Sequence, residues 1–347
     1  MPVKGRIAFG TTAIALAVAA CGGGPASDDT GVGNASGEGT TVTIYSGREE
    51  ELVGDLLEQF EGDTGIELEV RYGDSAELAA TILEEGEASP TDVFFSQDAG
   101  ALGAVAEAGL FRPIDQNILD RVDERFRSSD GLWVGTSGRA RVAAYNTQVL
   151  NDSGLPDSIA GFTEPRWKGR IGFPPTNSSF QAFVAAMIVE QGEDATRAFL
   201  EGLIANEPKL YEDNSSTVRA IAAGEIDVGF VNHYYIYEVA AEDGDIPVAN
   251  HFFTNGDAGA LVNAAGVGAL ATTDNADGAR EFIDYLTGDP GQTYFAEETF
   301  EYPVVTGERP SVELKSLAEI QSPDIDLSDL GGTLEPALTL LAEVGLL

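Results

Sequence analysis

Short apolar runs alternate with amphipathic segments in the chain that follows residue 40. Residues 41–45 form a β-branched run that predicts a strand, and residues 49–60 place their large apolar side chains at the spacing of one helix face. Further strands are expected at 66–72 and 92–96, and further helices at 76–85 and 99–108. Repeated strand and helix units predict an α/β fold with a parallel sheet covered by helices.

The same alternation resumes in the second half of the chain. Strands are expected at 170–173 and 227–231, and helices at 179–190, 195–203 and 217–223. The extended residues 132–142 could cross between two α/β lobes, and the apolar run 260–271 could return to the first lobe. This predicts one lobe from residues 41–140 and 262–312, a second from 141–261 and 313–347, and a cleft where the crossing segments form a hinge.

The N-terminal segment is typical of a signal peptide. Lys4 and Arg6 precede an apolar run, residues 7–20, that ends before Cys21. The small residues before Cys21 form a lipobox, so we expect cleavage and lipid attachment at this cysteine, which is the single cysteine of the chain. The alternative is an ordinary cleaved signal with an unmodified cysteine. Residues 21–40 are rich in Gly, Ser, Asp and Thr and predict a flexible tether, so the protein should be extracytoplasmic and anchored to the membrane through lipid only.

The charge excludes one class of partner. Lys and Arg number 19 against 58 Asp and Glu, giving a formal net charge of −39, so nucleic acid is not expected to bind. An acidic, lysine-poor surface is also consistent with life in high salt, where self-repulsion is screened. Charge alone names no ligand.

The adjacent tyrosines Tyr234 and Tyr235 are the most informative local feature. They follow the expected strand 227–231, and strand ends in open α/β sheets are where ligands bind. Two phenols can hold a hard, highly charged cation as phenolates, which suits ferric iron better than zinc or magnesium. The structural alternative is that one ring packs in a core while its neighbour faces solvent.

Several polar residues could hold an anion, and each has a structural alternative. Asn177, Ser178 and Ser179 precede the helix expected at 179–190, where hydroxyl and backbone N–H donors form an anion site but also cap helices. Asn214 presents the same choice. The remaining candidates are Arg139 and Arg141, which alternate on the crossing segment and could face a cleft anion or form surface ion pairs, and Glu49, whose place at a helix start is favoured by the helix dipole alone.

Enzyme signatures are absent from the sequence. It contains two histidines and no His-Glu-x-x-His, Gly-x-Ser-x-Gly or Walker A motif, so no catalytic residues are predicted. His233 beside the tyrosines could contribute to a metal site or lie at the surface or behind the ligands. A secreted hydrolase with a cleft is the enzymatic alternative.

An ordered set of segments resembles the bacterial periplasmic ferric-binding proteins, the iron-carrying receptors of ABC importers. In chain order these segments are Tyr45-Ser46-Gly47, residues 89–94, 137–142, 167–172 and 224–227, Asn232-His233-Tyr234-Tyr235, and Glu301-Tyr302-Pro303-Val304. The resemblance covers nearly all of the mature chain. It implies a two-lobed type II periplasmic-binding-protein fold, with hinge strands and a ligand cleft between the lobes.

The resemblance also implies roles for the candidate residues. Tyr234 and Tyr235 match the paired iron ligands, and residues 177–179 match a segment that holds a synergistic anion in some members. Asn214 and Asn232 match positions at or behind the anion site, and Arg139 and Arg141 resemble hinge arginines, one of which contacts an anion such as carbonate in some relatives.

Two positions depart from the family pattern. Glu49 stands where many members have histidine, and Gln97 where some have glutamate. Glu49 remains a suitable oxygen ligand for a hard cation, whereas neutral Gln97 is a poorer one that could act through a bound water. The first-lobe ligands therefore differ from the usual set.

The resulting hypothesis is a monomeric, extracytoplasmic receptor. It binds Fe³⁺ with a synergistic phosphate or carbonate and delivers the metal to the permease of an ABC importer. The alternative within the same class is a receptor for an organic ligand such as a polyamine, a thiamine-like cation or a sugar, for which the tyrosines would be stacking platforms.

Overall fold

The computed structural model describes residues 41–305 and 314–347. The predicted signal peptide, the tether and Cys21 lie outside the described residues, as do residues 306–312 of the predicted first lobe. None of the helices within the described ranges combines the length and the apolar character needed to cross a membrane.

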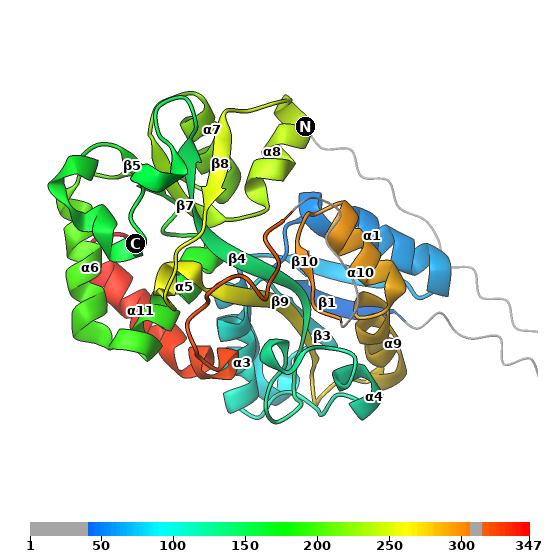
Figure 1. Cartoon of the computed structure of the whole chain (residues 1–347). Helices are drawn as coiled ribbons and strands as arrows, with labels where there is room; N and C mark the ends of the chain where they lie inside the picture. The colour runs from blue at the N-terminus through cyan, green and yellow to red at the C-terminus, as the bar shows by residue number, and fades with distance from the viewer. Residues whose placement is uncertain (1–40, 306–313) are drawn as a thin grey trace, which may run out of the picture. The chain divides into compact units, whose positions relative to one another are not determined.

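The strands form one mixed sheet whose two halves share a long central strand (Figure 1). In spatial order they are β2 (Leu68–Tyr72), β1 (Val42–Ser46), β3 (Val93–Ser96), β9 (Val262–Ala269), β4 (Val134–Asn146), β7 (Val228–Asn232), β5 (Ile171–Phe173) and β6 (Lys209–Leu210), while β8 (Val248–His251) and β10 (Tyr302–Pro303) also pair with β4. β1 is parallel to β2 and β3, and β5 is parallel to β6 and β7. Each half thus contains the parallel strands that repeated strand and helix units predict.

The strand β4 changes partners in its middle. It pairs antiparallel with β9 from Val134 to Ala140, and with β7 from Arg141 to Tyr145. This is the segment expected to cross at 132–142, and the change of partner falls between Ala140 and Arg141. We call the strands on the β9 side the first half-sheet and those on the β7 side the second half-sheet.

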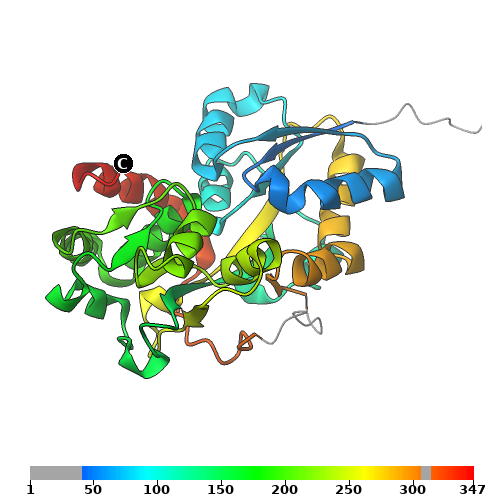
Figure 2. The ribbon, with the colours of Figure 1, turned by 90° about the horizontal axis from the view of Figure 1, so that it is seen from above.

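Eleven α-helices occur in the described residues. They are α1 (Glu50–Thr64), α2 (Ser75–Glu85), α3 (Ala99–Glu107), α4 (Gln116–Leu119), α5 (Ser178–Gln191), α6 (Glu193–Ala205), α7 (Asn214–Ala222), α8 (Tyr235–Asp243), α9 (Ala276–Leu286), α10 (Asp289–Glu297) and α11 (Gly331–Glu343). Figure 2 shows the blue and orange helices beside the first half-sheet and the green helices beside the second. The helices expected from the pattern of residues 49–108 and 179–223 are all present, with ends that differ by a few residues.

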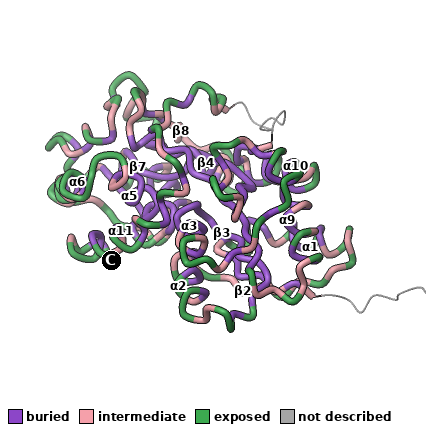
Figure 3. Tube along the Cα trace, turned by 90° about the horizontal axis from the view of Figure 1, so that it is seen from below, coloured by how far each residue is buried: buried purple, intermediate pink, exposed green. Residues whose placement is uncertain are grey.

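The long strands lie in the core. Every residue of β4 and of β9 is buried, and Figure 3 shows buried backbone through the middle of the sheet. A smaller apolar cluster beneath α7 and α8 contains Tyr234 and Tyr235 together with residues such as Val231 and Val239. The tyrosine pair is therefore built into a core and cannot move independently of it.

The last helix packs against both groups of helices. α11 contacts α3, beside the first half-sheet, and α5, beside the second. The contact with α3 is very close, because a Cβ atom added to Gly331 would lie 2.4 Å from the backbone carbonyl carbon of Gly103. Only glycine allows the two backbones to approach in this way.

Candidate ligand cleft and tyrosine site

A cavity of about 440 Å³ opens between residues of the two halves. The loop before α1, residues 72–74 and Gln97 line it from the first half, and residues 176–178 and 212–213 line it from the second. Its walls are acidic, with carboxylates at Glu49, Glu50, Glu51, Asp74, Glu212 and Asp213. The cavity therefore favours a cation over an anion at its mouth.

The two tyrosines lie behind this cavity, at the carboxyl end of β7. Tyr234 immediately precedes α8 and Tyr235 is its first residue, so the end of the strand and the start of the helix fix both side chains. Their rings stack with centroids 4.2 Å apart and planes at 29°, and only 0% and 2% of their surfaces are exposed. The alternative in which one ring packs in a core and the other faces solvent is therefore wrong, because both rings are buried.

Gln97 connects the tyrosines to the first half. Its side-chain amide Nε2 donates to the Tyr234 hydroxyl at 3.4 Å, and Gln97 itself lines the cavity. Among the described residues, neither the Gln97 carbonyl oxygen nor the Tyr235 hydroxyl has a hydrogen-bond partner, although both atoms are buried. Leaving a buried polar atom unpaired costs about 1–3 kcal/mol, so these atoms are poised to accept a ligand.

Both phenols are neutral without a bound cation. Burial is the main cause that raises the pKa of Tyr234 to about 12, and Glu301 adds to it while Arg139 and Arg48 oppose it. Burial, followed by Tyr234, Glu49 and Glu238, raises the pKa of Tyr235 well above its ordinary value. A ligand that binds these oxygens as phenolates must therefore supply a large positive charge.

An ion pair that the sequence did not predict supports the site. Arg48, in the loop before α1, donates to both carboxylate oxygens of Glu301 at 2.7 and 3.1 Å, and both side chains are fully buried. Burial disfavours each charge, but the partner outweighs it, so the pKa of Arg48 is raised and that of Glu301 is lowered. The pair holds the loop that carries Glu49, and only the fold could reveal it.

Glu49 reaches solvent at the cavity, although protein surrounds it on most sides. It is the N-cap residue of α1, but within the described part of the chain its side chain makes no capping hydrogen bond. Burial, and next Asp213 on the opposite wall, raise the pKa of its carboxyl, while Arg48 opposes them. Glu49 thus faces the cleft, as a ligand would, and is not held by its own helix.

The two hinge arginines differ in how they are paired. Arg141 donates to the backbone oxygen of Phe230 at 2.9 Å and to the Ser179 hydroxyl at 3.4 Å. Burial, and next the neighbouring Arg139, lower the pKa of Arg141 to about 9. Arg139 is 1% exposed, and its three guanidinium nitrogens have no hydrogen-bond partner among the described residues. A buried guanidinium without partners is a ready anion-binding group.

The polar turn before α5 is largely internally satisfied. Asn177 caps α5, and its Oδ1 accepts from the Ser179 backbone N–H at 3.0 Å, the Ser179 hydroxyl at 2.6 Å and the Asn214 amide at 3.2 Å. Ser178 lines the cavity. In the described structure the Asn214 Oδ1 and the Asn232 Nδ2 are buried without partners. Asn177 is therefore mainly a helix cap, and the free donor and acceptor lie at Asn232 and Asn214.

His233 has a structural role and does not lie at the surface. Its backbone N–H donates to the Ala140 oxygen at 2.9 Å, and its ring Nδ1 accepts from the Ala140 N–H at 3.2 Å. The ring Nε2 lies 3.2 Å from the Phe300 oxygen, which fixes a neutral ring protonated at Nε2. Burial lowers the pKa of His233 to about 4, and with both nitrogens used the ring is not free to bind a metal.

Glu238, on the helix that begins with Tyr235, is a further candidate residue that motif matching did not identify. It lies on α8, and its Oε2 is buried without a hydrogen-bond partner in the described chain. Burial, and next Glu49, raise the pKa of this carboxyl to about 8. The sequence did contain a signal for Glu238. It follows Tyr235 by three residues and Tyr234 by four, and side chains at these separations lie on one face of a helix.

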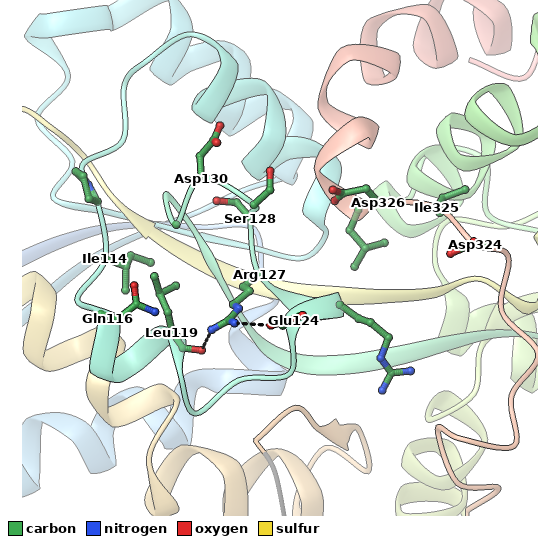
Figure 4. Close-up of a pocket in the computed structure, with 15 residues that line it drawn as sticks. Ile114, Gln116, Leu119, Glu124, Arg127, Ser128, Asp130, Asp324, Ile325 and Asp326 are labelled. Carbon is green, nitrogen blue, oxygen red and sulfur yellow. Dashed lines mark hydrogen bonds and ion pairs between the residues drawn. The ribbon is translucent and has the colours of Figure 1, made fainter.

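A second cavity, of about 710 Å³, lies elsewhere and contains none of the predicted site residues (Figure 4). Eleven residues of the segment 113–131, together with residues 324–327, line it, and Arg127 there donates to the Leu119 carbonyl and to Glu124. No group of three or more His, Cys, Asp or Glu in the described chain forms a metal centre. A metal site among the described residues would therefore need ligands of another kind, such as the two tyrosines.

Two half-sheets joined by the shared strand β4, with a cleft between them, define a two-lobed type II periplasmic-binding protein. The chain belongs to the family described as bacterial extracellular solute-binding protein, whose model matches residues 88–329. The predicted fold is thus confirmed, and the members of this family are solute-binding proteins and not enzymes.

Relatives support the predicted resemblance to ferric-binding proteins. The chain is 35% identical to the Fe(3+)-binding periplasmic protein of Serratia marcescens, over 88% of this chain and 90% of that protein. It is 31% identical to the major ferric iron-binding protein of Neisseria meningitidis serogroup B, over 88% and 93%. The crystal structure of iron-bound HitA from Pseudomonas aeruginosa superposes with a TM-score of 0.84 at 33% identity, covering 88% of this chain and 99% of that one.

Proposed function

We propose that the protein binds ferric iron outside the cytoplasm, together with a synergistic anion, and delivers the metal to an ABC importer. The observation that carries this proposal is the buried stack of Tyr234 and Tyr235, with the Tyr235 hydroxyl unpaired among the described residues and Gln97 reaching Tyr234 from the opposite wall. The iron-binding relatives support the same cargo.

The chemistry of the tyrosines favours a trivalent cation. Because burial keeps both phenols protonated, binding requires enough positive charge to displace two protons. Ferric iron is a hard cation that binds phenolate and carboxylate oxygens strongly, whereas divalent cations compensate less of this cost. Glu49, and Gln97 directly or through a bound water, would complete the ligand set from the first lobe.

The anion would bind near Arg139. This guanidinium is buried and, as far as the structure is described, unpaired, while Arg141 and the Asn232 amide lie on adjoining strand positions. These donors suit a small oxyanion such as phosphate or carbonate. Ser178 and the capping residues Asn177 and Ser179 would contribute hydroxyl and backbone donors, with Asn214 behind them.

Closure of the lobes would convert binding into a signal for the permease. We place the lobe boundaries at residues 41–140 with 262–312 and at 141–261 with 313–347, so that β4 crosses from one lobe to the other and the chain returns to the first lobe at the start of β9. Cation binding would draw the acidic walls together and stabilise a closed form that the importer recognises.

Lipid attachment at Cys21 would hold the receptor at the membrane. The proposal rests on Lys4, Arg6, the apolar run 7–20 and the small residues before Cys21. The relative from Serratia marcescens is named a periplasmic protein, and the family is described as extracellular, which is consistent with an extracytoplasmic location. We propose that the anchored receptor acts as a monomer on a tether formed by residues 21–40.

Visible spectroscopy tests the cargo. Chelator-stripped protein titrated with ferric citrate, with and without phosphate or carbonate, should develop a tyrosinate-to-iron charge-transfer band. The Tyr234→Phe, Tyr235→Phe double variant should fold, as judged by circular dichroism, and show no band. Tyr237→Phe, two residues further along α8, is the matched control and should retain it. No band in wild-type protein with any anion would overturn the iron assignment and favour an organic ligand.

A further inference from the structure

Glu238 carries an unexplained buried oxygen on the helix that begins with the tyrosines. Its Oε2 is the one carboxylate oxygen in the described residues that is buried without a hydrogen-bond partner. A carboxylate oxygen left unpaired in a folded protein is costly, so its presence calls for a ligand or a functional reason.

The spacing along α8 places Glu238 beside the tyrosines. It follows Tyr235 by three residues and Tyr234 by four, and side chains at these separations lie on the same helix face. By contrast, Glu242, one turn further on, is exposed and pairs with Arg219. The two glutamates of this helix therefore have different surroundings, one inside and one at the surface.

Charged side chains from both halves of the fold act on Glu238. Besides Glu242, they are Glu49, Glu301 and Arg48, and Glu238 in turn acts on both tyrosine hydroxyls. Glu49 and Arg48 come from the first half of the fold. The Glu238 carboxyl is therefore within electrostatic reach of both halves of the fold.

The charge of the cargo explains why a carboxylate is needed there. In the open receptor, before Glu49 of the first lobe and the synergistic anion join the site, two phenolates leave one positive charge of a ferric ion uncompensated. Burying net charge is costly unless it is paired. Resting on the proposed function, we propose that Glu238 is a direct oxygen ligand of the bound ferric ion and forms, with Tyr234 and Tyr235, a three-anion set on one turn of chain.

This ligand set would make the second lobe the primary holder of the metal. All three anionic oxygens would come from the start of α8, and the first lobe would add Glu49 and Gln97 on closure. Iron should consequently bind to the open receptor, before the lobes meet.

The test replaces the carboxylate while keeping its shape. Glu238→Gln, with Glu238→Ala as the second variant, is compared with wild type by competition against citrate and by the position of the charge-transfer band. We expect affinity to fall by at least about 10-fold to 100-fold, the loss typical when a group that only supports a metal ligand is removed, and the band to move to longer wavelength as iron becomes more electron-poor. Glu242→Gln is the matched control and should change neither quantity.

Three results would overturn the inference. Wild-type affinity and band position in Glu238→Gln, with the band still lost in the tyrosine double variant, would remove Glu238 from the site and leave the proposed function intact. Weaker binding with an unmoved band and a lower melting temperature of the iron-free protein would show a structural role. No band in wild-type protein would overturn the proposed function and this ligand with it.

Discussion

Arg48 and Glu301 form a fully buried ion pair across 253 residues of sequence. The pair joins the loop that carries Glu49 to the segment before β10, which itself pairs with the first part of β4. It therefore fixes one wall of the cleft to the crossing strand.

Breaking this pair should be strongly destabilising. Glu301→Gln leaves the Arg48 charge buried without its partner, and removing one member of a buried pair typically costs about 3–5 kcal/mol. The free energy of unfolding from urea denaturation measures the effect. Glu242→Gln, which removes a partner from the exposed pair with Arg219, should cost about 1 kcal/mol or less. An equal loss in the free energy of unfolding in both variants would contradict the prediction that the buried ion pair matters more to stability than the exposed one.

Arg139 should determine the effect of the anion on iron binding. Its guanidinium is buried without partners in the described structure, so Arg139→Met removes the donors that we assign to the anion. Phosphate or carbonate should then no longer strengthen iron binding in a citrate competition, although a weaker charge-transfer band should remain. Arg166→Met removes an exposed arginine and should leave the anion effect unchanged. A full anion effect in Arg139→Met would place the anion elsewhere.

Iron affinity should fall as the solution becomes more acidic. Both phenols have raised pKa values, so at neutral pH each is protonated before binding and releases a proton to become a phenolate. Each released proton makes affinity rise about tenfold per pH unit, so the two phenols alone give about a hundredfold. The Glu238 carboxyl, with its pKa raised to about 8, would add to this slope if it binds the metal as a carboxylate. Competition against a chelator, corrected for its own protonation and for ferric hydrolysis, measures the slope between about pH 6 and pH 8. An affinity independent of pH would exclude phenolate ligands.

The glycine contact between α3 and α11 should be sensitive to a single methyl group. A Cβ on Gly331 would lie 2.4 Å from the backbone of Gly103, so Gly331→Ala should force the helices apart and lower stability by about 1–3 kcal/mol. The neighbouring Gly332→Ala is the matched control, since its Cβ would meet the movable Glu107 carboxylate at 3.3 Å. Urea denaturation should separate the two variants, and equal stabilities would contradict the tight contact.

Local sequence patterns predicted much of the fold. The alternation of apolar runs and helical spacing located the helices of both halves, and the crossing segment proved to be β4. Those signals are local, because each depends on side chains within about one element. Tyr234 and Tyr235 were found in the same way, since a strand end followed by two phenols is a short-range pattern.

The remaining site features depend on contacts that sequence patterns do not encode. Arg48 and Glu301 become partners only when segments far apart in the sequence come together. The Asn177 side chain is used in capping, because donors of Ser179 and Asn214 converge on its one oxygen. His233 was considered for a metal or surface role, but the fold uses both of its ring nitrogens for backbone groups. Burial and pairing, which decide these roles, are properties of the folded chain.

The paired hydrogen bonds between His233 and Ala140 bear on which residues of the proposed site could be substituted. Two hydrogen bonds attach the residue before the tyrosines to the point where β4 exchanges one partner strand for the other. If the lobes close as proposed, the phenols would lie at the pivot, where rotation displaces them least. Glu49 and Gln97 would lie on the wall that moves, so substitutions there would change the ligand set without altering the hydrogen bonds that position the tyrosines.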